Sequence, residues 1–312
     1  MTSIIDIHGA HVLDFERFHL EHGEFEEAEA LGYSVLECVR DINTFLKSDK
    51  NNITTILPPP SSIFNYMVDG GRFDSDTFPF NYENNQLLQV MKFISKQGLD
   101  NRVIPFFGFS PNEKTESYYK YIEEITRRLP CGFKFHPLAM KTPISSLNGS
   151  RILEIASKRK IPLLIHTGRD EYSDSRQLVV LSREYPQVNL CAAHFGYFRK
   201  EFLESLSSSP NLFLDTSILS GLLKEIKSGN EKHVCLDAIP LKIRAKSEDY
   251  IFNWLVDTYG LENKILFGSD IKWTYHVGSN RENEISLANG LDYPESKKKK
   301  WLYSNARRFL RI

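Results

Sequence analysis

Three apolar segments of strand length end in a histidine, and this is the pattern in the chain best suited to chemistry. The segments are residues 4–8, 162–166 and 188–194, which end in His8, His166 and His194. Such short apolar runs suit strands buried on both faces of a parallel sheet. Because parallel α/β proteins gather polar groups at the C-terminal ends of their strands, we expect these three histidines to meet at one site.

Other residues at strand ends add to this set. Asp270 ends an apolar run, and Lys134 and His136 alternate along residues 132–137. Imidazoles with one carboxylate suit zinc or a similar divalent ion. Such an ion with an open coordination position lowers the pKa of its water to about 7 and polarises a carbonyl group. The pattern therefore predicts one divalent metal ion, zinc by preference, beside which a histidine or an aspartate such as Asp270 can move protons.

Each of these residues also has a structural interpretation. A single histidine is more often a hydrogen-bonded core residue than a ligand, but the joint pattern of His166, His194 and Asp270 favours a site. His136 is either a structural group or a substrate contact. Arg169 either pairs with a substrate carboxylate or is solvated. Asp215 is expected to cap the segment that follows it, and Asp6 to share a strand face with His8.

Strand and helix patterns alternate along the whole chain. Strands are expected at residues 4–8, 53–57, 102–109, 132–137, 162–166, 188–194, 211–216 and 264–270, and helices at 24–47, 85–97, 116–129, 150–160, 175–185 and 199–206. The middle spacings match the length of one βα unit. Eight units without a dinucleotide-binding glycine motif favour a closed (β/α)8 TIM barrel over an open sheet. We therefore predict one barrel domain over residues 1–312.

The longest interruption of this alternation is an insertion at about residues 61–84. It contains Gly70, Gly71 and Arg72 together with several aromatic residues. An insertion after the second strand leaves a barrel on its catalytic side, so we expect it to form a wall of the active-site mouth. The wall lies either within one subunit or in a homodimer interface, because exposed apolar patches commonly mark interfaces.

The composition excludes several classes of partner. Lys plus Arg (39) balances Asp plus Glu (40), which argues against nucleic acid and charged membrane surfaces and favours a small-molecule substrate. The four cysteines are scattered, so neither a disulfide framework nor a zinc knuckle is expected. No signal peptide or membrane-length apolar run is present, and we expect a cytoplasmic protein.

Read together, the strand ends resemble the amidohydrolase superfamily, and in particular the amidohydrolase-related branch that also holds nonoxidative decarboxylases of the aminocarboxymuconate-semialdehyde type. The motifs that carry the resemblance are Asp6-Ile-His8, Gly132-Phe-Lys-Phe-His-Pro137, Ile165-His-Thr-Gly168, Ala193-His-Phe-Gly196, Leu214-Asp-Thr-Ser217, Phe267-Gly-Ser-Asp270 and Asn305-Ala-Arg-Arg-Phe-Leu310. The resemblance implies a distorted barrel with a divalent metal held by His8, His166 and Asp270. His194 would handle protons or, in two-metal relatives, act as a further ligand.

One departure from the family pattern concerns the first strand. Family members carry His-x-His there, whereas this chain has His8-Gly9-Ala10-His11. Strict alternation turns His11 away from the face of His8, although a bulge at Gly9 can absorb the extra residue. Either His11 reaches the metal through such a bulge, or the site is one ligand short and binds metal weakly, or it works without metal.

The resemblance implies a metal-dependent hydrolase that acts on a small carboxylated or cyclic substrate. The alternatives are a decarboxylase of the same family, a metal-free lactonase and a barrel that only binds a ligand. In some superfamily members a strand-4 lysine is carboxylated and bridges two metals. For Lys134 we favour a role as the anchor of an anionic substrate, with His136 and Arg169 as further substrate-binding candidates.

Overall fold

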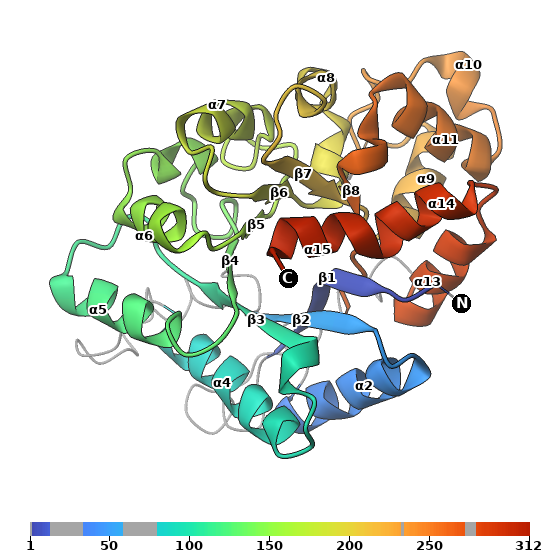
Figure 1. Cartoon of the computed structure of the whole chain (residues 1–312). Coiled ribbons are helices and arrows are strands. Elements are labelled where there is room, and N and C mark those ends of the chain that lie inside the picture. Colours follow the sequence, from blue (N-terminus) through green and yellow to red (C-terminus); the bar gives the residue numbers. More distant parts are fainter. Residues whose placement is uncertain (1, 13–33, 59–79, 232–233, 272–278) are drawn as a thin grey trace, which may run out of the picture.

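The computed structural model describes residues 2–12, 34–58, 80–231, 234–271 and 279–312. Its centre is a sheet of eight parallel strands paired in chain order. The strands are β1 (Ile5–His11), β2 (Ile53–Leu57), β3 (Val103–Gly108), β4 (Gly132–Phe135), β5 (Leu163–Ile165), β6 (Leu190–Ala192), β7 (Leu212–Asp215) and β8 (Ile265–Leu266). The (β/α)8 prediction is confirmed (Figure 1).

The sheet closes on itself between its first and last strands. β8 is only two residues long. The chain around it nevertheless bonds to β1, with Ile7 N donating to Phe267 O over 3.0 Å and Ile271 N to Gly9 O over 3.1 Å. These bonds join the two edges of the sheet into a nearly closed barrel.

Helices surround the barrel in Figure 1. Those of the described part are α2 (Val35–Ser48), α4 (Asn81–Ser95), α5 (Glu116–Ile125), α6 (Arg151–Arg159), α7 (Arg176–Glu184), α8 (Lys200–Leu206), α9 (Leu219–Ser228), α10 (Leu241–Arg244), α11 (Glu248–Thr258), α13 (Arg281–Gly290), α14 (Glu295–Lys299) and α15 (Asn305–Leu310). Several begin at a serine that accepts a backbone N–H of the first turn, as Ser34, Ser150 and Ser247 do. Their apolar faces cover the outside of the sheet.

Two apolar clusters separate the inside of the barrel from its outside. Phe133 and Phe135 belong to the outer cluster, between sheet and helices. The inner cluster holds Leu164 and Phe213 and is filled from below by α15 through Ala306, Phe309 and Leu310. Since side chains alternate along a strand, Lys134 between the two phenylalanines points into the barrel. The same rule points Asp215 inward, two residues after Phe213.

Most predicted elements agree with the structure, and β2 matches its predicted range. The strand predicted at 188–194 is wrong in its last two residues, because β6 ends at Ala192 and His194 opens a separate turn. The helix predicted at 24–47 is described from Val35 onward. The predicted insertion is also too long, since α4 already begins at Asn81; its residues 61–79 lie outside the described part of the chain.

A buried ionic network anchors the end of β8. Asp6 accepts Ser269 N (2.9 Å), Ser269 Oγ (2.6 Å) and Arg281 Nε (3.1 Å), and Arg281 also pairs with Asp41 on α2 at 2.5 Å. Asp6 is fully buried and Arg281 is 1% exposed. A charge this deep is tolerated only when it is paired, so the network fixes β1, α2 and α13 against the chain that leads into Asp270.

Among the described residues, no helix has the length and apolarity needed to cross a membrane.

Glu83 in the first turn of α4 is a buried carboxyl group with an orphaned oxygen. It is 1% exposed, and its Oε2 has no hydrogen-bond partner within the described part of the chain. Burial raises the pKa of Glu83 to about 7. The folded state therefore retains a proton that the unfolded chain has lost between about pH 4.5 and pH 7, and the free energy of unfolding falls as the pH rises through this range.

The first prediction concerns this slope. Glu83→Gln removes the ionisation and should flatten the fall in the free energy of unfolding between pH 4.5 and pH 7, which amounts to roughly 3 kcal/mol. Urea unfolding at several pH values measures it. Glu154→Gln, which alters an exposed first-turn glutamate of α6, should leave the slope unchanged. Equal slopes in wild-type protein and Glu83→Gln would refute the assignment.

Candidate metal centre and active site

An irregularity in β1 decides which way its histidines face. Asp6 pairs with Thr54 and Ala10 with Ile56, so four steps along β1 match two along β2. Ile5 and Ile7 belong to the inner cluster, and strict alternation would place both Asp6 and His8 outside. The extra residues instead turn His8 inward. The expectation that Asp6 and His8 share a face is therefore wrong, because the bulge separates them.

Gly9 makes this bulge sterically feasible. A Cβ atom at position 9 would lie 2.2 Å from Thr55 O and 2.6 Å from Thr54 Oγ1, closer than any side chain tolerates. Gly9 N also donates to Thr55 Oγ1 over 3.1 Å. The backbone of β1 thus approaches β2 at a point where only glycine fits.

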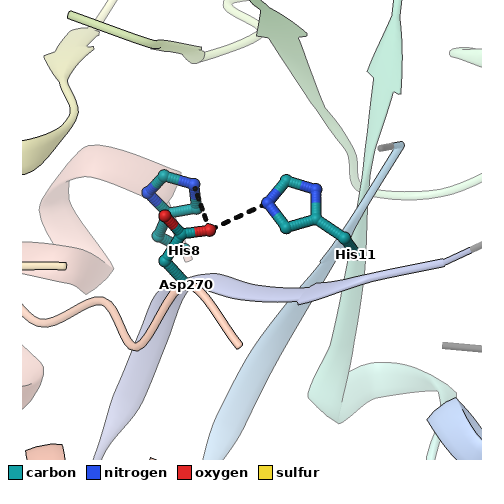
Figure 2. Close-up of side chains that lie close together, drawn as sticks. All are labelled: His8, His11 and Asp270. Carbon is teal, nitrogen blue, oxygen red and sulfur yellow. Dashed lines mark hydrogen bonds and ion pairs between the residues drawn. The ribbon is translucent and has the colours of Figure 1, made fainter. Parts of the chain in front are cut away.

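The bulge brings His8 and His11 to the same oxygen of Asp270 (Figure 2). Nε2 of His11 lies 2.9 Å from Asp270 Oδ1, and Nε2 of His8 lies 3.4 Å from it. The three side chains are at most 5% exposed. Together they form a group that can hold a metal ion. Of the three possibilities left open by the sequence, the geometry favours the one in which His11 joins the site through a bulge.

Hydrogen bonds at the far side of each ring fix which nitrogen faces Asp270. His8 Nδ1 donates to Asp215 Oδ2 over 2.9 Å, and His11 Nδ1 donates to the carbonyl of Pro58 over 2.7 Å. Both partners are acceptors, so both Nδ1 atoms carry the proton, and in the neutral rings both Nε2 atoms present lone pairs. Two lone pairs and a carboxylate that face one another require a cation between them, and a carboxylate or carbonyl behind each histidine is the usual support of a metal ligand.

The amine of Lys134 lies next to this centre. Its Nζ lies 2.9 Å from His8 Nε2, inside the barrel, and the side chain is 4% exposed. Burial lowers the pKa of Lys134, and the nearby Asp270 and Asp215 oppose that shift. The prediction that Lys134 anchors a substrate stays a prediction, but the structure places its amine against the candidate metal ligand His8.

Asp215 is the hub of the hydrogen bonds around the centre. Beyond the contact with His8, its Oδ1 accepts His194 N (3.0 Å), Ser217 N (2.9 Å) and Ser217 Oγ (2.5 Å). Burial by itself would raise the pKa of Asp215, but the contact with His8 lowers it to about 2. The expected capping contact to Ser217 N is present. The expectation missed the larger role, for which the only sequence signal is an acid at the end of an apolar strand.

Ser217 connects Asp215 to His194 through two hydrogen bonds. Its hydroxyl donates to Asp215, so it accepts the proton of His194 Nδ1, 2.9 Å away. The lone pair of His194 Nε2 then accepts from His166 Nδ1 at 3.1 Å and lies 3.8 Å from Asp270 Oδ2. His194, His8 and Asp215 also form a possible ligand group. Because the His8–Asp215 contact in that group is already a hydrogen bond, we assign it to support of the centre.

His194 is held by an unusual backbone. The turn η4 (His194–Phe198) has positive φ at every residue, from 53° to 62°. A left-handed conformation costs roughly 1–2 kcal/mol for each non-glycine residue. The turn is buried and bonded at several points, with Ser175 Oγ donating to Gly196 O over 2.7 Å. Strain of this kind persists where the surrounding structure imposes it and is common at functional sites.

Burial keeps four imidazoles around the centre neutral. It lowers the pKa of His194 to about 4 and depresses those of His11, His136 and His166. Burial by itself would raise the pKa of Asp270, but the adjacent imidazoles of His8 and His11 hold it well below its usual range. At neutral pH the centre therefore presents a carboxylate and ring lone pairs, which is the state that binds a metal.

The other predicted site residues lie at different places around this centre. His136 stacks on His166 with ring centroids 3.9 Å apart, and its Nδ1 accepts Ala139 N at 3.3 Å. His166 reaches the centre through His194 and belongs to neither possible ligand group of the described residues. Its assignment as a metal ligand stays a prediction.

Arg169 is exposed, and its carbonyl oxygen accepts Arg199 Nη2 at 3.1 Å. It lines a cavity of about 220 Å³ with Tyr197, Arg199, Glu231, Val234 and Cys235. Its role in substrate binding also stays a prediction.

Comparisons with known proteins agree with the fold. A family model described as Amidohydrolase matches residues 75–312. A probable 2-pyrone-4,6-dicarboxylic acid hydrolase from Acinetobacter baumannii has a TM-score of 0.60 at 15% identity, covering 99% of this chain and 100% of that chain. The 5-carboxyvanillate decarboxylase from Sphingomonas paucimobilis has a TM-score of 0.61 at 12% identity and covers 100% of both chains.

A further structure that matches contains a metal. It is the 5-carboxyvanillate decarboxylase from Novosphingobium aromaticivorans, complexed with manganese and 4-hydroxy-3-methoxy-5-nitrobenzoic acid. Its TM-score is 0.59 at 11% identity, with 100% of this chain and 96% of that chain covered. Identities this low support the shared fold alone. No curated protein sequence matches this chain significantly.

The second prediction tests the bulge. Gly9→Ala places a methyl group against the Thr55 carbonyl, which must push the two strands apart and move His8 and His11 out of register. We expect weaker metal binding, measured by calorimetric titration, together with a lower thermal midpoint. Gly290→Ala adds a methyl group where nothing lies within 4 Å and should leave the metal affinity unchanged without lowering the thermal midpoint. Unchanged metal affinity in Gly9→Ala would show that the bulge does not position the ligands.

Proposed function

The chain belongs to the amidohydrolase family, and from this premise we propose that it is a metal-dependent hydrolase acting on a small carboxylated or cyclic substrate. One observation carries the proposal. The Nε2 atoms of His8 and His11 both face Asp270 Oδ1, at 3.4 and 2.9 Å, with their protons committed to the opposite ring nitrogens. This donor set fits a divalent cation.

The metal would be held by His8, His11 and Asp270, with His166 as the proposed further ligand. When bound, a divalent ion supplies a water of lowered pKa and polarises a carbonyl oxygen. The protein's own part is to exclude bulk water and to keep the two imidazoles in the correct tautomer. Asp215 does so for His8, and the Pro58 carbonyl for His11.

His194 is the proposed proton carrier. Its Nε2 lone pair is 3.8 Å from Asp270 Oδ2, and its Nδ1 proton is held by Ser217, which Asp215 orients. A proton taken up at Nε2 would leave an imidazolium whose charge the Asp215 carboxylate stabilises through Ser217. Asp270 is the second candidate for proton transfer because its Oδ2 faces His194.

Three residues are proposed to bind the substrate. Lys134 would pair with a carboxylate inside the barrel, next to the metal centre. His136 offers a ring face already stacked against His166, and Arg169 offers a guanidinium group beyond β5. A substrate with a carboxylate and a flat ring fits these groups.

A nonoxidative decarboxylase is the second candidate. It is supported by two decarboxylases of known structure, which match this chain over its whole length as well as the hydrolase does. Decarboxylation would use His194 to deliver a proton to carbon instead of taking one from water. The substrate's carboxylate would be the group lost, so release of carbon dioxide distinguishes the two reactions.

Zinc is the proposed metal because imidazole and carboxylate ligands suit it, while the manganese in one structure of the same fold makes manganese the first competitor. A cytoplasmic location and a homodimer completed by residues 61–84 stay predictions from the sequence.

The third prediction is a graded series of aspartate variants. Asp270→Asn removes a ligand and should abolish tight metal binding. Asp215→Asn removes the support behind His8 and should weaken binding roughly 10–100-fold. Asp257→Asn alters an exposed residue of α11 that pairs with Lys297 and should have no effect. Metal content after dialysis and titration calorimetry measure the series; full metal occupancy in Asp270→Asn would contradict the proposed centre.

The fourth prediction separates metal binding from turnover. His194→Asn should retain the metal and lose about 10²–10⁴-fold in kcat towards any substrate that the wild-type enzyme converts, found by screening cyclic esters, amides and aromatic carboxylates. Loss of metal in His194→Asn would make it a ligand instead. Wild-type activity that survives complete chelation would favour the metal-free lactonase.

A further inference from the structure

Lys134 is a buried ammonium group with unused hydrogen-bonding capacity. An ammonium has three N–H donors. Within the part of the chain that the structure describes, the hydrogen bond of Lys134 Nζ is the 2.9 Å contact with His8 Nε2, and no carboxylate lies within ion-pair distance of it. The side chain is 4% exposed, so water can satisfy the remaining donors only in part.

The partner of Lys134 is also the atom that a metal needs. His8 Nδ1 gives its proton to Asp215, so Nε2 is the only lone pair that the neutral ring can offer. One lone pair cannot accept an N–H bond from Lys134 and bind a metal at the same time. Metal binding therefore removes this hydrogen bond and leaves the ammonium group buried beside a dication, which is strongly unfavourable.

The formal charges of the centre show which further ligand makes its net charge zero once a divalent ion is bound. With a protonated Lys134 amine, Asp215 and Asp270 contribute −2 and Lys134 contributes +1, so the three together carry −1. A divalent ion changes this sum to +1. A ligand with one negative charge returns it to zero and accepts the free donors of Lys134.

We propose that Lys134 couples the two ligands of this site, so that a carboxylate and the divalent metal bind cooperatively. In the absence of both, the ammonium group occupies the lone pair of His8. A carboxylate draws Lys134 away and frees that lone pair for the metal, and the metal in turn frees Lys134 for the carboxylate. The inference rests on the proposed metal centre and goes further, since it makes a carboxylate next to Lys134 a condition for tight metal binding.

The geometry also separates this role from a purely structural one. A lysine that only fills the barrel would need a permanent acceptor, as Lys264 has in the carbonyl of Ser209 at 2.5 Å. Lys134 instead has as its partner a ring nitrogen that the metal takes over. It is therefore a switchable donor, whereas Lys264 is a fixed one.

The test is a thermodynamic cycle at constant pH with Mn²⁺ and benzoate as probes. The dissociation constant (Kd) of Mn²⁺ is measured by calorimetry on the full-length protein, alone, with saturating benzoate and with benzamide. Benzamide has the same size without the charge, and titration of Mn²⁺ into benzoate alone corrects for association in solution. We expect benzoate to lower the Kd of Mn²⁺ at least about fivefold and benzamide to leave it unchanged. Saturating Mn²⁺ should lower the Kd of benzoate by the same factor.

Two variants locate the coupling. Lys134→Met should bind Mn²⁺ more tightly than wild-type protein in the absence of benzoate and should show no effect of benzoate. The matched variant Lys264→Met, which changes a buried lysine before β8, should keep the wild-type coupling.

The possible outcomes are distinct. A wild-type Kd for Mn²⁺ that benzoate does not change overturns the proposal, and this result needs no variant to fold. Coupling that persists in Lys134→Met overturns the role of Lys134. If wild-type protein binds neither Mn²⁺ nor Zn²⁺ with or without benzoate, the proposed metal centre itself fails. If Mn²⁺ binds with the same Kd with and without benzoate, the coupling is contradicted and the proposed metal centre is not.

Discussion

The site depends on the mutual approach of three buried acceptors, namely Nε2 of His8, Nε2 of His11 and Oδ1 of Asp270. In a medium of low dielectric constant such an arrangement is stable only around a positive charge. Much of the surrounding structure serves to impose it. Asp215 and the Pro58 carbonyl hold the rings in one tautomer, and the Asp6–Arg281 pair holds the chain that carries Asp270.

Backbone strain accompanies this arrangement. Asp270 itself has a φ of 51°, and the turn that carries His194 is left-handed throughout. Buried hydrogen bonds anchor both segments. Ser269 and Asp270 donate backbone N–H groups to His8 O, and Asp215 accepts the N–H of His194. The surrounding packing thus holds Asp270 and His194 in conformations that they would not adopt alone.

The positive charge of the centre comes from the barrel wall as well as from any metal. Lys134 reaches the centre because alternation along β4 turns it inward between two phenylalanines that pack outside. A resident ammonium group next to a metal ligand makes the charge of the site adjustable. This property suits an enzyme whose substrate brings its own carboxylate, since neither ligand then needs to bind strongly alone.

The sequence by itself determined the barrel and most of the chemistry-bearing positions. Apolar runs of strand length, amphipathic helices and their spacing are local properties, so eight βα units and the terminal residues His166, Lys134 and Asp270 could be predicted from order and type alone. Only the tertiary structure decided how these residues combine. The side on which His8 and His11 lie depends on a bulge against Thr55, and the role of Asp215 depends on contacts with residues as far away in sequence as His8. Such contacts cannot be predicted from local patterns, because a shift of one residue in strand register exchanges the inner and outer faces.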